Sequence, residues 1–240
     1  PIALAALAAG KQVFCEKPMA LSAADCGRMI DAAKQNNRVL MIGHVLRFSP
    51  EYQFLSDFVK STRYGPVLSA TFTRRCGLPD WSAWLPVEAR SGGAVLDLLI
   101  HDIDQILLLF GAPRRVSAKK LGITDALTAS LLYPHGPEVR LQGGWFPPGM
   151  PLSMSFQIRA ERADLHFGPD GLFLNGSKQD LMPREPLEMF EKELAYFLEC
   201  CENGKPPVLC PPEESAMAVK LALLLKESRA KEGEQIECLV

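Results

Sequence analysis

The sequence lacks an apolar run long enough to cross a membrane. The longest candidate, residues 94–110, is interrupted by Asp97 and four further polar or charged residues, whereas a spanning helix needs about 20 consecutive apolar residues. It also lacks an excess of charge of one sign, because 26 Lys and Arg stand against 28 Asp and Glu, a formal net charge of −2. Neither a nucleic-acid footprint nor a basic membrane-binding patch is present. We therefore expect no nucleic-acid partner and no membrane association.

Closely spaced cysteine pairs are also missing. The seven cysteines are scattered and none forms a Cys-x-x-Cys pair, so the spacing supports neither a zinc site nor a disulfide framework. We expect reduced thiols, a cytoplasmic protein and no bound metal. The apolar start, residues 1–10, has no basic segment before it, which favours a buried helix over a secretory signal.

The first 64 residues show the pattern of helices that alternate with continuous apolar strands. The pattern predicts helices over residues 2–9, 23–35 and 50–60 and strands over 12–15 and 39–43. Ser22 is a candidate N-cap for the second helix. Alternation of this kind is half of a doubly wound α/β domain, so we expect a partial Rossmann-like parallel sheet in residues 1–64.

The pattern changes after Pro66 to short alternating strands with turn-rich links. We expect an α+β domain over residues 65–240 with a mostly antiparallel open sheet, so that the fold class of the whole chain is α/β. The expected strands are residues 67–74, 115–121, 126–133, 139–145, 152–160, 164–167 and 172–174, and the expected helices are 93–110, 186–202 and 213–231. The strands between 126 and 160 carry apolar residues such as Leu131 and Trp145. The domain's own helices can cover one face of the sheet, but the other face needs a partner, so we expect a homodimer or homotetramer.

The helix expected over residues 93–110 carries the most informative residues. Asp97, His101 and Asp104 are spaced at i, i+4 and i+7, which places them on one face of a helix that is otherwise rich in Leu and Ile. An Asp–His pair in a buried cleft can hold an imidazole in one tautomer as a general base. The alternative is a core histidine oriented by Asp97 with no chemical role. Asp102 is expected to point elsewhere, solvated or ion-paired.

Two further segments follow the ends of the predicted parallel strands. Lys17 lies in Glu16-Lys17-Pro18, where ligands of open α/β sheets bind, and a lysine there can stabilise a developing alkoxide. A solvated lysine in a surface turn is the alternative. His44 and Arg47 follow the second strand; capping of the next helix explains its neighbours Ser49 and Pro50 but neither His44 nor Arg47.

Taken together, three motifs resemble the Gfo/Idh/MocA family of oxidoreductases. Its E-K-P pattern matches residues 16–18, its R-F-x-P pattern matches 47–50, and its G-G-x-x-x-D-x-G-x-H-x-x-D pattern matches 92–104. The resemblance implies that Lys17, Asp97 and His101 form a catalytic trio, with His101 as the base. It also implies that Glu16, Lys17 and Pro18 lie beside the nicotinamide of NAD or NADP, with a Lys–Pro bond that is often cis.

The chain departs from the family pattern at two points. Leu99 stands where the family usually has Gly, which narrows the space beside His101. The glycine-rich turn G-x-G-x-x-G occurs nowhere in the chain, so we expect the N-terminal nucleotide-binding segment, on the order of 70–80 residues, to be missing.

The resemblance implies reversible hydride transfer between NAD(P) and a secondary alcohol of a sugar, inositol or related polyol. His44, Arg47, Trp84, Arg90 and Asp104 are the expected substrate contacts. Trp81 is a further candidate, because aromatic rings stack on sugar faces, although both tryptophans could instead be core residues. Two alternatives stay open: a non-catalytic member of the family that senses a ligand or partner, and an NAD-dependent glycosidase.

Overall fold

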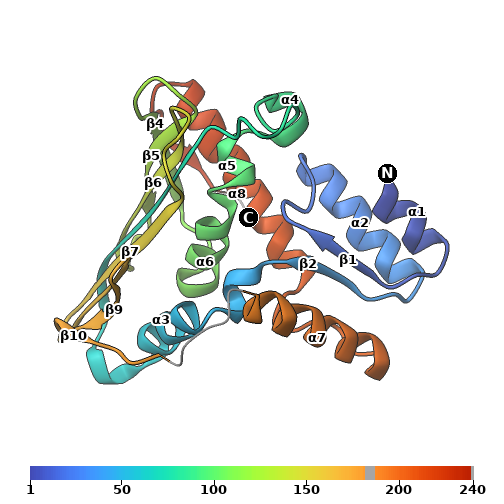
Figure 1. Cartoon of the computed structure of the whole chain (residues 1–240), viewed down its shortest axis with the longest axis horizontal. Coiled ribbons are helices and arrows are strands. Elements are labelled where there is room, and N and C mark those ends of the chain that lie inside the picture. Colours follow the sequence, from blue (N-terminus) through green and yellow to red (C-terminus); the bar gives the residue numbers. More distant parts are fainter. Residues whose placement is uncertain (182–186, 239–240) are drawn as a thin grey trace.

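The computed structural model describes residues 1–181 and 187–238. A two-stranded parallel sheet with its helices lies beside a nine-stranded sheet, and helices fill the space between them (Figure 1). This arrangement confirms the α/β fold class, with a small parallel sheet followed by a large, mostly antiparallel one. No described helix is both long enough and apolar enough to cross a membrane.

The parallel sheet forms from the two continuous apolar runs of the first 64 residues. Strand β1 (Val13–Glu16) pairs with β2 (Leu40–Gly43), and α1 (Ile2–Ala8), α2 (Ala23–Gln35) and α3 (Pro50–Lys60) alternate with them. Helix α2 begins where the sequence predicts, because the Ser22 hydroxyl accepts a hydrogen bond from the backbone N–H of Asp25 at 3.1 Å. Two short 3₁₀ turns, η1 (Val45–Phe48) and η2 (Thr62–Tyr64), flank α3.

The large sheet has the strand order β10-β9-β8-β7-β3-β6-β5-β4-β11, in which only β3 and β6 are parallel neighbours among the described strands. Its strands are β3 (Val67–Gly77), β4 (Arg115–Lys120), β5 (Ala126–Leu132), β6 (Glu138–Phe146), β7 (Ser153–Ala160), β8 (Asp164–Gly168), β9 (Gly171–Leu174), β10 (Ser177–Lys178) and β11 (Ile236–Glu237). The first seven of these match the expected strands, and the two-residue strands β10 and β11 were not expected.

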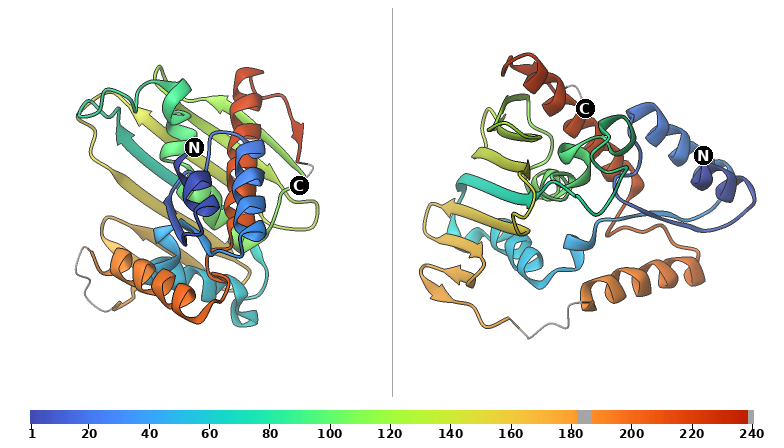
Figure 2. Two further views of the ribbon diagram at one scale, coloured as in Figure 1. Left: turned by 90° about the vertical axis from the view of Figure 1, so that its right-hand side faces the viewer. Right: turned by 45° about the horizontal axis from the view of Figure 1, so that its top comes forward.

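Helices cover one face of this sheet and leave the other face open (Figures 1 and 2). The covering helices are α3, α5 (Ala94–Asp97), α6 (Ile100–Phe110) and α8 (Pro212–Ala230), while α4 (Glu88–Ser91) and α7 (Glu188–Asn203) lie further out. Leu131 and Trp145, which the sequence analysis used as a reason for a partner, are each 2% exposed and belong to the covered face. The open face is lined instead by residues such as Ser130, Arg140 and Gln157. The apolar residues of these strands therefore face the chain's own helices, as expected for one side of the sheet, and the face left open for a partner is polar.

The last two helices both contact the parallel sheet, and α8 also contacts the large sheet. Helix α8 packs against β4 and α6 of the large sheet layer and against α2 and β2 of the parallel layer. The ring of Phe197 on α7 contacts that of Phe14 on β1, with centroids 5.6 Å apart. Helix α7 was expected to start at Pro186, which lies outside the described residues.

Candidate active site

Lys17 and Asp97 come together although 80 residues separate them in the sequence. The Lys17 ammonium donates to the backbone carbonyl of Asp97 at 2.7 Å and to its carboxylate Oδ1 at 3.1 Å. Lys17 follows the carboxyl end of β1, and Asp97 is the last residue of the short helix α5. Both side chains are about one-fifth exposed, at 20% and 23%, so a small molecule can reach the pair. The Lys17–Pro18 peptide bond is cis.

The helix expected over residues 93–110 is broken between α5 and α6. The N–H groups of Leu98 and Leu99 both donate to the carbonyl of Ala94, at 2.8 and 2.9 Å. The second of these bonds spans five residues instead of four, so the regular α-helical hydrogen-bond pattern is interrupted here. Leu99, at the position where the family pattern has Gly, is fully buried at this break. The expected single helical face of Asp97, His101 and Asp104 is therefore interrupted.

His101 lies in the first turn of α6, on the far side of this break. Its ring Nδ1 is buried and has no hydrogen-bond partner among the described residues. Burial holds the pKa of His101 well below its ordinary range, and the positive charges of Arg74 and Lys17 lower it further. The imidazole is therefore neutral at neutral pH, the form in which a histidine accepts a proton, and the lowered pKa makes it a weaker base than a free imidazole. The described residues show no hydrogen bond between Asp97 and His101, so Asp97 holds Lys17 here instead of orienting the histidine.

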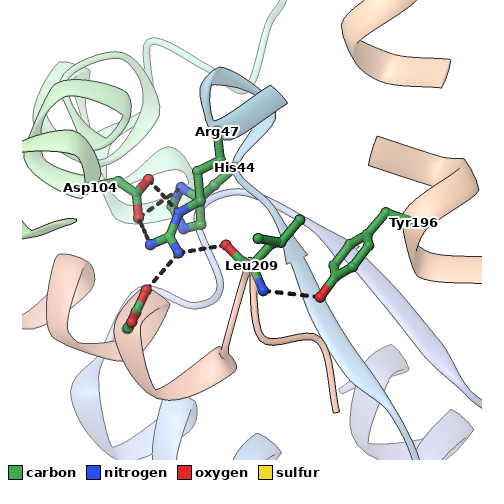
Figure 3. A network of polar contacts seen from close by, with 6 residues as sticks. His44, Arg47, Asp104, Tyr196 and Leu209 are labelled. Atoms are coloured by element: carbon green, nitrogen blue, oxygen red, sulfur yellow. Dashed lines mark hydrogen bonds and ion pairs between the residues drawn. The ribbon is translucent and has the colours of Figure 1, made fainter. Parts of the chain in front are cut away.

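Asp104 pairs with Arg47 in a buried network (Figure 3). The Arg47 guanidinium donates to both Asp104 oxygens, at 3.0 and 2.6 Å, and also to the carbonyl of Leu209 and to Glu214. The Arg47 and Asp104 side chains are only 4% and 2% exposed. Arg47 thus joins η1 to α6 and to the start of α8. Its ion pair with Asp104 holds these elements together.

His44 is the remaining polar group in this network. It is 2% exposed, and neither ring nitrogen has a hydrogen-bond partner within the described parts of the chain. Its Nδ1 lies 3.6 Å from Asp104 Oδ1, which is too long for a hydrogen bond. Burial lowers the pKa of His44 despite the opposing charge of Asp104. A neutral imidazole with two unsatisfied nitrogens is a site where a ligand or a water molecule could bind.

Arg74 supports the helix that carries His101, although none of the three sequence motifs includes it. Arg74 lies on β3 and donates from Nε to Asp102 Oδ2 at 2.6 Å and from Nη2 to Asp102 Oδ1 at 3.1 Å. The pair fixes the first turn of α6, next to His101, against the large sheet. Asp102 is thus ion-paired, one of the two states expected for it. The signal was present in the alternation of β3, because Arg74 shares the buried face of Ala70 and Phe72.

The other expected contacts are solvent-exposed residues before and on α4. Trp81 and Trp84 are 79% and 46% exposed on the loop before α4, and Arg90 is exposed on α4 itself. Neither tryptophan is therefore a core residue.

Glu16 is exposed at the end of β1, and its carboxylate lies so close to Gly43 that a Cβ there would approach Oε2 to 3.3 Å.

The strand ends fit the nicotinamide end of a dinucleotide. Glu16, Lys17 and Gly43 are at the carboxyl ends of parallel strands, where such ligands bind in doubly wound folds, and Lys17 lies near enough to His101 for its charge to lower the pKa of that histidine. The described residues contain no group of three or more His, Cys, Asp or Glu side chains that could hold a metal ion.

Comparison with known proteins gives consistent matches. Residues 1–44 match the profile of an oxidoreductase family with an NAD-binding Rossmann fold, and residues 52–166 match that of the GFO/IDH/MocA C-terminal domain. The D-glucoside 3-dehydrogenase of Escherichia coli strain K12 is 35% identical over 98% of this chain and 74% of its own length. The inositol 2-dehydrogenase of Acidothermus cellulolyticus is 37% identical over 45% of this chain and 30% of its own.

Solved structures show the same fold. The aldose-aldose oxidoreductase from Caulobacter crescentus, complexed with glycerol, superposes with a TM-score of 0.83 at 23% sequence identity. The superposition covers 99% of this chain and 75% of that protein.

Proposed function

This chain belongs to the GFO/IDH/MocA oxidoreductase family, and we propose that it carries the catalytic residues of an NAD- or NADP-dependent dehydrogenase. The substrate class that we propose is a sugar, inositol or related polyol with an oxidisable secondary alcohol, as in the names of the two curated relatives. The observation that carries the proposal is the contact between Lys17 and Asp97. It joins the end of β1 in the parallel sheet to α5, and His101 lies in the first turn of the next helix, α6.

In this proposal His101 is the general base and Lys17 polarises the reacting oxygen. A neutral imidazole can accept the hydroxyl proton, and burial keeps His101 neutral. Lys17 donates two hydrogen bonds to Asp97 and has a third N–H available for a substrate oxygen. Asp97 then acts by fixing the lysine. A bound nicotinamide would supply the hydride acceptor, beside Glu16, Lys17 and Pro18.

We assign the substrate contacts unequally. Trp84 and Arg90 are exposed near the start of α5, and His44 has unsatisfied nitrogens, so these three remain proposed substrate contacts. Arg47 and Asp104 already satisfy each other in a buried position, and we propose that they support the site without contacting the substrate. Trp81, the most exposed of the set, would reach a larger substrate only.

The chain as a whole is proposed to be a cytoplasmic homodimer or homotetramer. Residues 1–64 would be the remainder of the dinucleotide-binding domain and 65–240 the substrate-binding and oligomerisation domain; the two family profiles, which match on either side of residues 45–51, support this division. The open, polar face of the nine-stranded sheet is the surface available for self-association. Light scattering at micromolar concentration tests this, and a monomeric mass would contradict it.

The function is tested by following NADH or NADPH formation with a panel of inositols, aldoses and glycosides, using the protein expressed from its complete reading frame. We expect turnover with at least one polyol and its loss in Lys17→Met, whereas Lys11→Met, which changes an exposed lysine, should stay active. Cleavage of a glycoside without net formation of reduced cofactor would favour a glycosidase, because hydrolysis returns the hydride to the sugar within each cycle. Ligand binding without any turnover would favour a sensor and refute the dehydrogenase.

A further inference from the structure

The short helix α5, which ends in Asp97, is held at its N-terminus by Asp125, a residue of the turn before β5 that lies outside the three sequence motifs. The backbone N–H of Ala94 donates to Asp125 Oδ2 at 2.7 Å, and the other Asp125 oxygen pairs with Arg229 of α8. Lys226, one turn earlier on α8, donates to the carbonyl of Gly92 at 2.7 Å. Both ends of the Gly92–Gly93 turn are thus tied to α8 and to the turn before β5.

Helix α5 needs this external support because it is only four residues long. The first N–H groups of a helix have no partner within it, and one helical turn in isolation is unstable. Here the Ser91 hydroxyl accepts from Gly93 at 3.0 Å and Asp125 accepts from Ala94. Gly93 has φ +77°, and a Cβ there would lie 2.5 Å from Asp125 Oδ2. The carboxylate therefore lies directly against the backbone that it supports.

Asp125 is itself fixed by the large sheet. Its carbonyl accepts a hydrogen bond from the N–H of Trp145 on β6 at 2.9 Å. The Asp125 and Arg229 side chains are 25% and 16% exposed, so solvent only partly screens their attraction. A continuous chain of contacts thus runs from α8 through Asp125 and α5 to Asp97 and then to Lys17.

We propose that Asp125 is a positioning residue for the Lys17–Asp97 pair. By capping α5, Asp125 sets where the carbonyl and carboxylate of Asp97 meet the Lys17 ammonium. The catalytic consequence rests on the proposed dehydrogenase function, but the placement of Lys17 does not. Loss of the cap lets α5 shift, which loosens the lysine without touching any group that contacts the substrate.

Two readouts in the full-length protein test the placement of Lys17 separately from its catalytic consequence. The first is acetylation of Lys17 at neutral pH, measured by peptide mass spectrometry relative to the exposed Lys11 and Lys60, and it needs no activity. The second is the division of any activity loss between kcat and KM. The variants are Asp125→Ala, which removes the cap, and Asp125→Asn, which keeps an oxygen for Ala94. Asp170→Asn, in the exposed turn after β8, is the matched control.

We expect Asp125→Ala to raise Lys17 acetylation roughly two- to fivefold, the factor that corresponds to loosening a partly exposed ion pair. Its kcat should fall about 10- to 100-fold at little-changed KM, as a misplaced catalytic group predicts. Asp125→Asn should recover most of both readouts, and Asp170→Asn should change neither.

A folded Asp125→Ala protein with unchanged Lys17 acetylation overturns the proposal. If that variant does not fold, Arg229→Met removes the partner that holds the Asp125 carboxylate, and a smaller rise in Lys17 acetylation is expected from it; no rise overturns the proposal. Increased acetylation in a protein whose wild type shows no turnover would retain the positioning role and refute the dehydrogenase function.

Discussion

Glu193 is a buried acid whose substitution should change the pH dependence of stability. It lies on the inner face of α7 and is 1% exposed, and its Oε1 has no hydrogen-bond partner among the described residues. Burial raises the pKa of Glu193 to about 8, and the negative charge of Glu16 contributes to the rise. The folded protein therefore holds a proton on Glu193 at neutral pH, whereas an unfolded chain ionises the same group at its ordinary pKa near 4.5.

The sign of the effect follows from proton binding. Between these two pKa values the folded state binds one more proton than the unfolded state, so stability decreases as pH rises. One such group removes up to about 1.4 kcal/mol per pH unit, which gives a ceiling of about 2.7 kcal/mol between pH 5.5 and 7.5. Water penetration and side-chain rearrangement reduce such penalties, so we expect a loss of about 1–2 kcal/mol.

Glu193→Gln keeps the shape of the side chain and removes its ionisation. Urea unfolding of wild type and variant at pH 5.5, 6.5 and 7.5 should show the variant gaining about 1–2 kcal/mol on the wild type across this range. Glu199→Gln, an exposed change on the same helix, is the control and should gain nothing. A difference between Glu193→Gln and wild type that is independent of pH would refute the argument, as would a carboxyl NMR titration of Glu193 with its midpoint near 4.5.

Three further changes test the site and the fold. His101→Ala should lower kcat roughly 10²- to 10⁴-fold with cofactor affinity unchanged in calorimetry; wild-type kcat between pH 6 and 9 would exclude His101 as the base. Arg74→Met should cost about 3–5 kcal/mol in urea unfolding because it leaves Asp102 buried and unpaired, and the double change with Asp102→Leu should recover most of that loss. Ser22→Ala should cost about 1 kcal/mol through the lost N-cap, and a cost near zero would show that the cap contributes little to α2.

Much of the fold was predictable because local patterns agree with the final packing. The apolar runs at β1 and β2, the Ser22 cap and the alternation of the sheet strands each specify one element without reference to distant residues. The convergence of Lys17 with the helix that carries Asp97 was also within reach, because functional groups of doubly wound folds gather at the carboxyl ends of strands. Local pattern and family motif together predicted the candidate site.

The internal geometry of the site was not predictable in the same way. The break between α5 and α6 arises because two N–H groups share the carbonyl of Ala94, and nothing in the local sequence of Leu98 and Leu99 disfavours a continuous helix. The spacing of Asp97 and His101 therefore suggested a hydrogen bond between them. In the structure Asp97 instead accepts hydrogen bonds from Lys17, which is 80 residues away in the sequence. Asp125 and Arg229, separated by 104 residues, were beyond any argument from spacing.

Three charge pairs join elements from both sheet layers. Lys17–Asp97 links β1 to α5, Arg47–Asp104 links η1 to α6, and Lys34–Glu213 links α2 to α8 at a 2.9 Å separation. The buried Arg47 pair demands a fixed geometry, whereas the exposed Lys34 pair is screened and adds little. Substitutions in the Arg47 pair would therefore disturb the chemistry for every substrate alike. We propose that selectivity among substrates comes from groups outside these pairs, such as Trp84, which is 46% exposed on the loop before α4.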